Sequence, residues 1–241
     1  MTDMALPKVN DWLAFRRHLK LLADEFPGQF THWVLIGGGA CWFYRTVLER
    51  WADADFPAPV FSEQDEANWL SKDIDFMGST IKEAEMLLGA PFKVDTHTIS
   101  FRGIEVDFLE QGVRLTRDEA ARNARQARTP DFVFRVLDAG WLYAEKLAVV
   151  HNKERLQDRL HLRALETFLK CEFCREVEDP ATLDADEWVE RARTVKTANH
   201  DFFSNDSVLI ARLQRGIVAI TQREHRAVKH WAKYHLPGYT E

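Results

Sequence analysis

The chain has 241 residues, which is enough for one large domain or two small ones with a substantial core. A composition that is 46% hydrophobic, with eight tryptophans and sixteen phenylalanines, excludes a disordered chain. The net charge of −6 argues against a general nucleic-acid coat protein, although it leaves room for a local basic groove. No apolar run approaches the roughly 20 residues that cross a bilayer, and residues 1–5 lack the features of a signal peptide. We therefore expect a cytoplasmic protein with no membrane partner.

The three cysteines are an odd number and do not indicate a disulfide framework. Cys171 and Cys174 have the spacing of metal ligands, but a structural zinc site needs four ligands and the chain has no second pair. We therefore predict two reduced thiols on or near a helix.

The first elements predicted along the chain are a helix, a strand and a second helix. Residues 8–25 have apolar side chains at helical spacing and stop before Pro27, and residues 32–36 form a short apolar run typical of a buried strand. Residues 40–51 again have helical spacing. Three glycines, Gly37 to Gly39, separate the strand from this helix, and such a turn points backbone N–H groups at an anion.

Residues 52–70 are the least regular part of the chain, because Pro57 and Pro59 interrupt the pattern and acids outnumber bases. We expect an inserted loop here with a short helix at 64–70. Regular patterns then return, and they predict a strand at 72–77, a helix at 80–88 opened by a capping box, and strands at 92–96, 98–102 and 104–109.

A second capping box, Thr116 with Glu119, predicts a helix that carries Arg122, Arg125 and Arg128. A strand is predicted at 132–137, and everything after it has a helical pattern: 138–151, 155–170, 184–196, 206–220 and 222–234. The predicted fold class is therefore α/β (α+β), with a small mixed sheet flanked by helices in residues 1–137 and a helical C-terminal region in residues 138–241.

Acidic residues on two of the predicted strands are the candidate metal ligands. In a strand, residues two apart share a face, so Asp73 and Asp75 point one way while Ile74 and Phe76 enter the core. Asp107 alternates with apolar residues in the same manner. Two metal ions about 4 Å apart need several carboxylates that converge from different strands. These three aspartates could supply that convergence, while Gly37 to Gly39 would let a triphosphate approach the backbone.

The order of these features resembles the DNA polymerase β-like nucleotidyltransferase superfamily, in which a glycine pair and a helix precede an Asp-x-Asp strand. Within it, the chain is most similar to the AbiEii-type nucleotidyltransferases, which are often toxins of toxin–antitoxin pairs. Gly37-Gly38-Gly39-Ala40 stands where that family has Gly-Gly-Thr-Ala, and Asp73-Ile74-Asp75-Phe76 stands where it has Asp-Ile-Asp-Leu. A later helical motif of the family is matched by Lys146, in Glu-Lys-Leu-Ala, and by Asp158.

The resemblance implies a nucleotidyltransferase fold and transfer of a nucleoside monophosphate from an NTP to an acceptor hydroxyl of RNA, tRNA or protein. It implies two Mg²⁺ ions, held by Asp73, Asp75 and Asp107, and an antitoxin as a possible partner. The residues that it implies for nucleotide binding are Gly37, Gly38, Gly39, Lys72 and Lys146, and Asp158 would support Lys146 or another catalytic group.

Three departures from the family pattern stand beside these motifs. Gly39 replaces the hydroxyl residue that would follow the glycine pair, and the 52–70 insertion lengthens the gap between Gly38 and Asp73. His161 replaces the second acid of the later motif. None of them touches the three carboxylates, so the expected metal site is kept.

Two other functions stay open at this stage. The same site could nucleotidylate a small molecule such as an aminoglycoside, which a narrow acidic cleft would favour over RNA. Alternatively, the chain could be a non-catalytic, partner-binding member of the fold, such as an antitoxin-like regulator.

Overall fold

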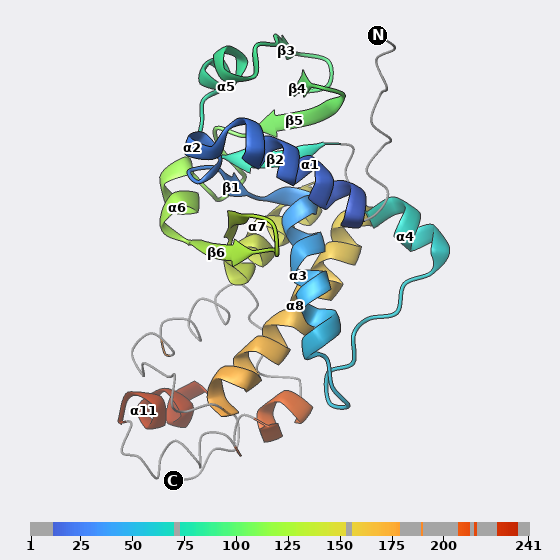
Figure 1. The fold of residues 1–241 in the computed structure, drawn as a ribbon. Coiled ribbons are helices and arrows are strands. Elements are labelled where there is room, and N and C mark those ends of the chain that lie inside the picture. Colours follow the sequence, from blue (N-terminus) through green and yellow to red (C-terminus); the bar gives the residue numbers. More distant parts are fainter. Residues whose placement is uncertain are drawn as a thin grey trace.

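The computed structural model describes residues 12–69, 73–152, 156–178, 189, 207–212, 215 and 226–235. In this part of the chain, helices surround one mixed, seven-stranded β-sheet (Figure 1). The strands are β1 Val34–Leu35, β2 Ile74–Met77, β3 Phe92–Lys93, β4 Thr98–Phe101, β5 Ile104–Phe108, β6 Ala124–Arg128 and β7 Val133–Leu137. The helices are α1 Trp12–Glu25, α2 Pro27–Phe30, α3 Gly37–Trp51, α4 Glu63–Trp69, α5 Ile81–Leu88, α6 Arg117–Arg122, α7 Ala139–Asn152, α8 Leu156–Glu178 and α11 Arg226–His235.

The strand order is β3-β4-β5-β2-β1-β7-β6, so the strand with Asp75 lies in the middle of the sheet. Strand β2 pairs with β5 in parallel and with β1 antiparallel, and β1 pairs with β7 in parallel. The remaining neighbours pair antiparallel. The expected mixed sheet flanked by helices is therefore confirmed.

The two faces of β2 differ because successive residues of a strand point to opposite sides. Phe76 is buried on one face, where its ring lies 6.1 Å from that of Phe30 in α2 and 5.5 Å from that of Trp33. Asp75 lies on the other face, against the start of α3. This alternation, which the sequence predicted, places the apolar side chains in the core and leaves one face of the strand for chemistry.

Helix α8 is the longest described helix, and it extends away from the sheet alongside α3 (Figure 1). It packs on α3 and α7, and its buried residues Leu165 and Phe168 belong to the same hydrophobic core as those of the sheet. The predicted domain boundary between residues 137 and 138 stays a prediction.

One predicted helix is wrong in its second half. Thr116 and Glu119 do form the expected capping box, but α6 ends at Arg122, and Arg125 and Arg128 lie in strand β6. The change of structure comes at Asn123, whose carbonyl accepts the N–H of Asp138. Pairing with β7 over the whole length of β6 outweighs the local helical pattern, which is common for short elements.

The other differences concern the bounds of elements. Helix α3 begins at Gly37 and not at Ala40, and the short α2 was not predicted. Helix α8 continues past residue 170 because Cys171, Phe173 and Cys174 extend its buried face. The predicted helices at 184–196, 206–220 and 222–234 fall largely outside the described residues; residues 207–212 and α11 are helical.

The three cysteines are all buried and free, as predicted. Burial raises the pKa of Cys41 to about 12 and that of Cys171 to about 11, so neither is a reactive thiolate at neutral pH. Among the helices of the described ranges, none has the length and apolar character that crossing a membrane requires.

Gly39 is a packing position between α3 and α1. A Cβ built on Gly39 would lie 2.8 Å from the Cε2 atom of Phe15 and 3.3 Å from the Cδ1 atom of Leu35. Both neighbours are buried, so they have little room to move. Phe15 therefore occupies the space that a side chain at position 39 would need.

We predict that Gly39→Thr lowers the free energy of unfolding by about 1–3 kcal/mol through overpacking. Urea denaturation measures the loss, and Phe15→Leu in the same chain should recover part of it. Gly28→Ala is the control, because a Cβ there meets nothing within 4 Å. A Gly39→Thr protein as stable as the wild type would contradict the packing role.

Candidate metal centre

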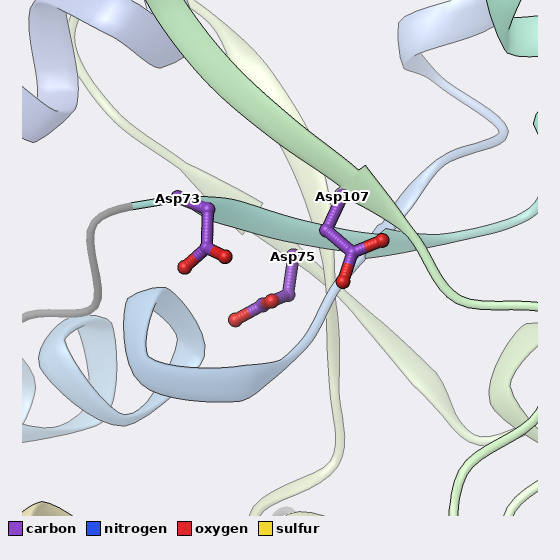
Figure 2. Close-up of side chains that lie close together, drawn as sticks. All are labelled: Asp73, Asp75 and Asp107. Carbon is purple, nitrogen blue, oxygen red and sulfur yellow. The ribbon is translucent and has the colours of Figure 1, made fainter. Parts of the chain in front are cut away.

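Three aspartates form a cluster on one face of the sheet (Figure 2). Asp75 and Asp107 are direct partners across the parallel pair β2–β5, and Asp73 precedes the first residue of β2. Each residue offers a carboxylate oxygen, and these oxygens all lie within 4.8 Å of one another. All three residues are partly buried. The strand pairing therefore brings together the three residues that the sequence analysis selected.

Gly37 makes room for this cluster. Its φ angle is +62°, in the left-handed region that glycine adopts readily. A Cβ at this position would lie 2.6 Å from the Cγ atom of Asp75, inside the carboxylate group. The first glycine of the run is thus required by the aspartate itself. Close approach of a triphosphate to the glycines stays a prediction.

The beginning of α3 faces the same carboxylates (Figure 2). A backbone hydrogen bond from Gly38 to Asp75 lowers the pKa of that carboxyl in part. The first N–H groups of a helix have no partner within the helix, and together they form its positive end. The start of α3 therefore attenuates the negative charge of the cluster.

Gathering three carboxylates in one place makes their charged forms unfavourable. Burial, with the nearby charge of Asp73, raises the pKa of Asp75 to about 8, even though Lys146 acts in the opposite direction. Burial and Asp73 likewise raise the pKa of Asp107 to about 6, while His97 lowers it. Without a cation, the folded chain therefore holds protons at neutral pH that the unfolded chain would release.

Lys146 and Asp158 form a buried ion pair beside the cluster. The Nζ atom of Lys146 lies 2.7 Å from Oδ1 of Asp158, and the side chains are 12% and 0% exposed. Burial would lower the pKa of Lys146, but Cys41, Asp158 and Asp75 together raise it. Burial would raise the pKa of Asp158, but the adjacent ammonium of Lys146 keeps it below its ordinary value. Lys146 thus stays charged and acts on Asp75.

Glu145, the residue before Lys146, has a role that the sequence analysis did not find. Its carboxylate accepts the backbone N–H groups of Val113 and Arg114, the latter at 2.9 Å. A Cβ on Gly112 would lie 2.9 Å from the Cδ atom of Glu145, so this glycine is also needed. Helix α7 therefore holds the loop that follows β5 and Asp107. No local pattern could have shown it, because 31 residues separate Glu145 from Arg114.

The remaining predicted site residues lie in different places. Gly38 and Gly39 are buried in the first turn of α3, and Lys72 lies outside the described residues. Arg125 does not line an open groove, because it pairs with both Asp138 and Glu172.

The donor set fits a hard divalent cation. Three carboxylates supply only oxygen ligands, which Mg²⁺ and Mn²⁺ prefer. The Asp73, Asp75 and Asp107 cluster could hold such an ion, and it is the one group of three or more His, Cys, Asp or Glu residues with this property among the described residues. In comparisons with known proteins, no protein-family model matches the chain, and no curated protein is significantly similar to it.

We predict that Asp75→Asn stabilises the metal-free protein, and more so as the pH rises. The pKa of Asp75 is about 8 in the folded state against an ordinary 3.8, so its protonated form favours folding. This contribution is complete below about pH 4 and is lost as the pH rises towards 8. The difference in free energy of unfolding between variant and wild type should therefore grow from pH 5 to pH 8, by at least about 1 kcal/mol.

Urea denaturation in EDTA at several pH values measures this difference. Asp24→Asn, in an exposed pair with Lys20, is the control for the loss of one negative charge. In buffer without EDTA, added Mn²⁺ should stabilise the wild type and leave Asp75→Asn almost unchanged. A stability difference that does not depend on pH would contradict the electrostatic account of the cluster.

We predict that Asp158→Asn lowers the free energy of unfolding by about 3 kcal/mol, because it leaves the buried ammonium of Lys146 without its partner. Asp24→Asn should cost less than about 1 kcal/mol, as an exposed pair contributes little. Guanidinium denaturation of the two variants at pH 7 gives the comparison. Equal, small losses would show that Lys146 does not depend on Asp158.

Proposed function

We propose that this chain is a Mg²⁺-dependent nucleotidyltransferase of the DNA polymerase β-like superfamily, most similar to its AbiEii-type members. The observation that carries the proposal is the convergence of Asp73, Asp75 and Asp107, whose oxygens lie within 4.8 Å, at the start of a helix that opens with glycines. Carboxylates on adjacent strands suit divalent cations, and a glycine-rich helix start suits phosphate. The two together suit a metal–triphosphate complex.

The roles of the residues follow from these positions. Asp73, Asp75 and Asp107 would hold two Mg²⁺ ions, which screen the phosphate charge and align the attacking oxygen when bound. The turn formed by Gly37, Gly38 and Gly39 would cradle the triphosphate at the positive end of α3, and the ammonium of Lys146 would offset negative charge next to Asp75. A carboxylate oxygen of Asp107 would accept the proton of the acceptor hydroxyl. That hydroxyl oxygen then bonds to the α-phosphorus as pyrophosphate leaves.

We propose RNA, such as tRNA, as the acceptor, and growth inhibition countered by an antitoxin as the biological role. Both rest on the resemblance of Gly37 to Ala40, Asp73 to Phe76, Lys146 and Asp158 to the AbiEii pattern. Growth arrest when the protein is expressed, abolished by Asp75→Asn, would support a toxin.

We predict that Asp107→Asn reduces nucleotide transfer at least about 100-fold. The amide that replaces the carboxylate binds a metal ion weakly and cannot accept the proton of the acceptor hydroxyl. The assay supplies each of the four α-³²P-labelled NTPs with Mg²⁺ and follows the label into total tRNA, the protein itself or kanamycin. Glu105→Gln is the matched control. Glu105 lies on the same strand but binds Thr98 and Lys93, so its amide should leave turnover within about three-fold of the wild type.

The position of the label separates the candidate functions. Label on tRNA or on the protein supports the proposed transferase, whereas label on kanamycin alone indicates a small-molecule nucleotidyltransferase. A wild-type protein that consumes no NTP but forms a stable complex that survives Asp73→Ala would indicate a non-catalytic binding protein. That result would overturn the proposal.

A further inference from the structure

A buried series of contacts leads from Lys146 to Trp69, the last residue of α4. Asp158 pairs with Lys146 at 2.7 Å, and its Oδ1 atom lies 3.6 Å from Nδ1 of His161. On the other side of the imidazole ring, Nε2 lies 2.8 Å from the carbonyl oxygen of Trp69. Asp158, His161 and Trp69 are all 0% exposed. Three elements, α7, α8 and α4, therefore meet through one histidine.

The hydrogen bond to Trp69 determines which nitrogen of His161 carries the proton. A carbonyl oxygen only accepts, so Nε2 must be the donor. Burial lowers the pKa of His161, so the ring is neutral and Nδ1 is unprotonated. The 3.6 Å from Nδ1 to Asp158 exceeds hydrogen-bond length. The one N–H group of the ring is therefore committed to Trp69.

Trp69 is the last residue of α4, and the final carbonyls of a helix have no partner within it. A buried carbonyl without a hydrogen-bond partner destabilises the folded state, so the hydrogen bond from His161 stabilises the end of α4. The indole is fixed as well: Phe61 and His161 lie 4.8 and 5.1 Å from it, and the Arg45 guanidinium lies 4.6 Å from its centre. The end of α4 is thus anchored at both its side chain and its backbone.

Asp73 depends on this anchor more than the other two aspartates do. The ladder between β2 and β5 begins at Ile74, so Asp75 and Asp107 are held by strand pairing while Asp73 precedes it. Asp73 follows Trp69 by only four positions, and a connection that short restricts where the chain can enter β2. The carbonyl of Trp69 and the first ladder residue therefore bound the position of Asp73 from its two sides.

We propose that His161 is a positioning residue for the metal centre: by capping the Trp69 carbonyl, it fixes the end of α4, four positions before Asp73. The inference rests on the metal-binding part of the proposed function. An acid at position 161, as in the family pattern, could not donate to a carbonyl. The acceptor of this hydrogen bond, Trp69, lies in the predicted insertion at 52–70, between α3 and β2.

Two amide variants separate the two sides of the ring. In His161→Gln, the amide nitrogen reaches the place of Nε2 and can still donate to Trp69. In His161→Asn, the shorter amide ends near the place of Nδ1, so it can face Asp158 but not reach Trp69. Isothermal titration with Mn²⁺ measures the metal centre directly, without any turnover.

We expect His161→Gln to bind Mn²⁺ within two-fold of the wild-type dissociation constant and His161→Asn to bind at least five-fold more weakly. Cys171→Ala is the control, because it removes a contact with the carbonyl of Phe56, in the same inserted segment but 17 residues before Asp73. It should leave Mn²⁺ binding unchanged. Thermal unfolding in EDTA confirms that each variant is folded.

Each of the two histidine variants can by itself disprove the positioning role of His161. A glutamine variant that binds Mn²⁺ weakly, or an asparagine variant that binds it as the wild type does, overturns the positioning role, as does a wild-type protein that binds no Mn²⁺. Failure of the proposed activity gives a different result: Mn²⁺ binding with the expected order of variants, but no NTP turnover by the wild type.

Discussion

The contact between the Asp75 carboxylate and Gly37 is the constraint on which the site depends. The carboxylate occupies the volume that a Cβ at position 37 would fill, and the left-handed φ of Gly37 turns the chain from β1 into α3 at that point. One glycine thus brings the start of α3 onto the acidic face of β2. Because Asp107 of β5 is the register partner of Asp75 in β2, its carboxylate lies at the same end of α3.

This arrangement concentrates like charge, and the surrounding residues balance it. Burial and the charge of Asp73 raise the pKa values of Asp75 and Asp107, so the charged form of the cluster is unfavourable without a cation. Lys146 offsets part of that charge, but a buried ammonium needs its own partner, which is Asp158. Charges therefore alternate in sign from the sheet into α7 and α8. Destabilisation of this kind is expected where a protein keeps a site for a cation.

Patterns that depend on neighbouring residues predicted the fold well. Both capping boxes, at Thr80 and Thr116, form as predicted, and the alternation in residues 73–77 and 104–108 places the aspartates on one face. Contacts between distant residues could not be predicted in this way. Strand β6 arises from its pairing with β7, and Glu145 holds a loop more than thirty residues away. Neither interaction produces a periodic pattern of residues that the sequence would reveal.

Gly39 and His161 are each explained by a partner from another element of the fold. Gly39 lacks a side chain where Phe15 of α1 fills the space, and His161 supplies a donor where the carbonyl of Trp69, at the end of α4, needs one. Each residue is therefore constrained by its partner, because a threonine at position 39 would meet Phe15 and an acid at position 161 would leave a buried carbonyl unsatisfied. The packing of α1 and α4 around the site thus determines these two positions, while the strand pairing of β2 with β5 determines where Asp75 and Asp107 lie.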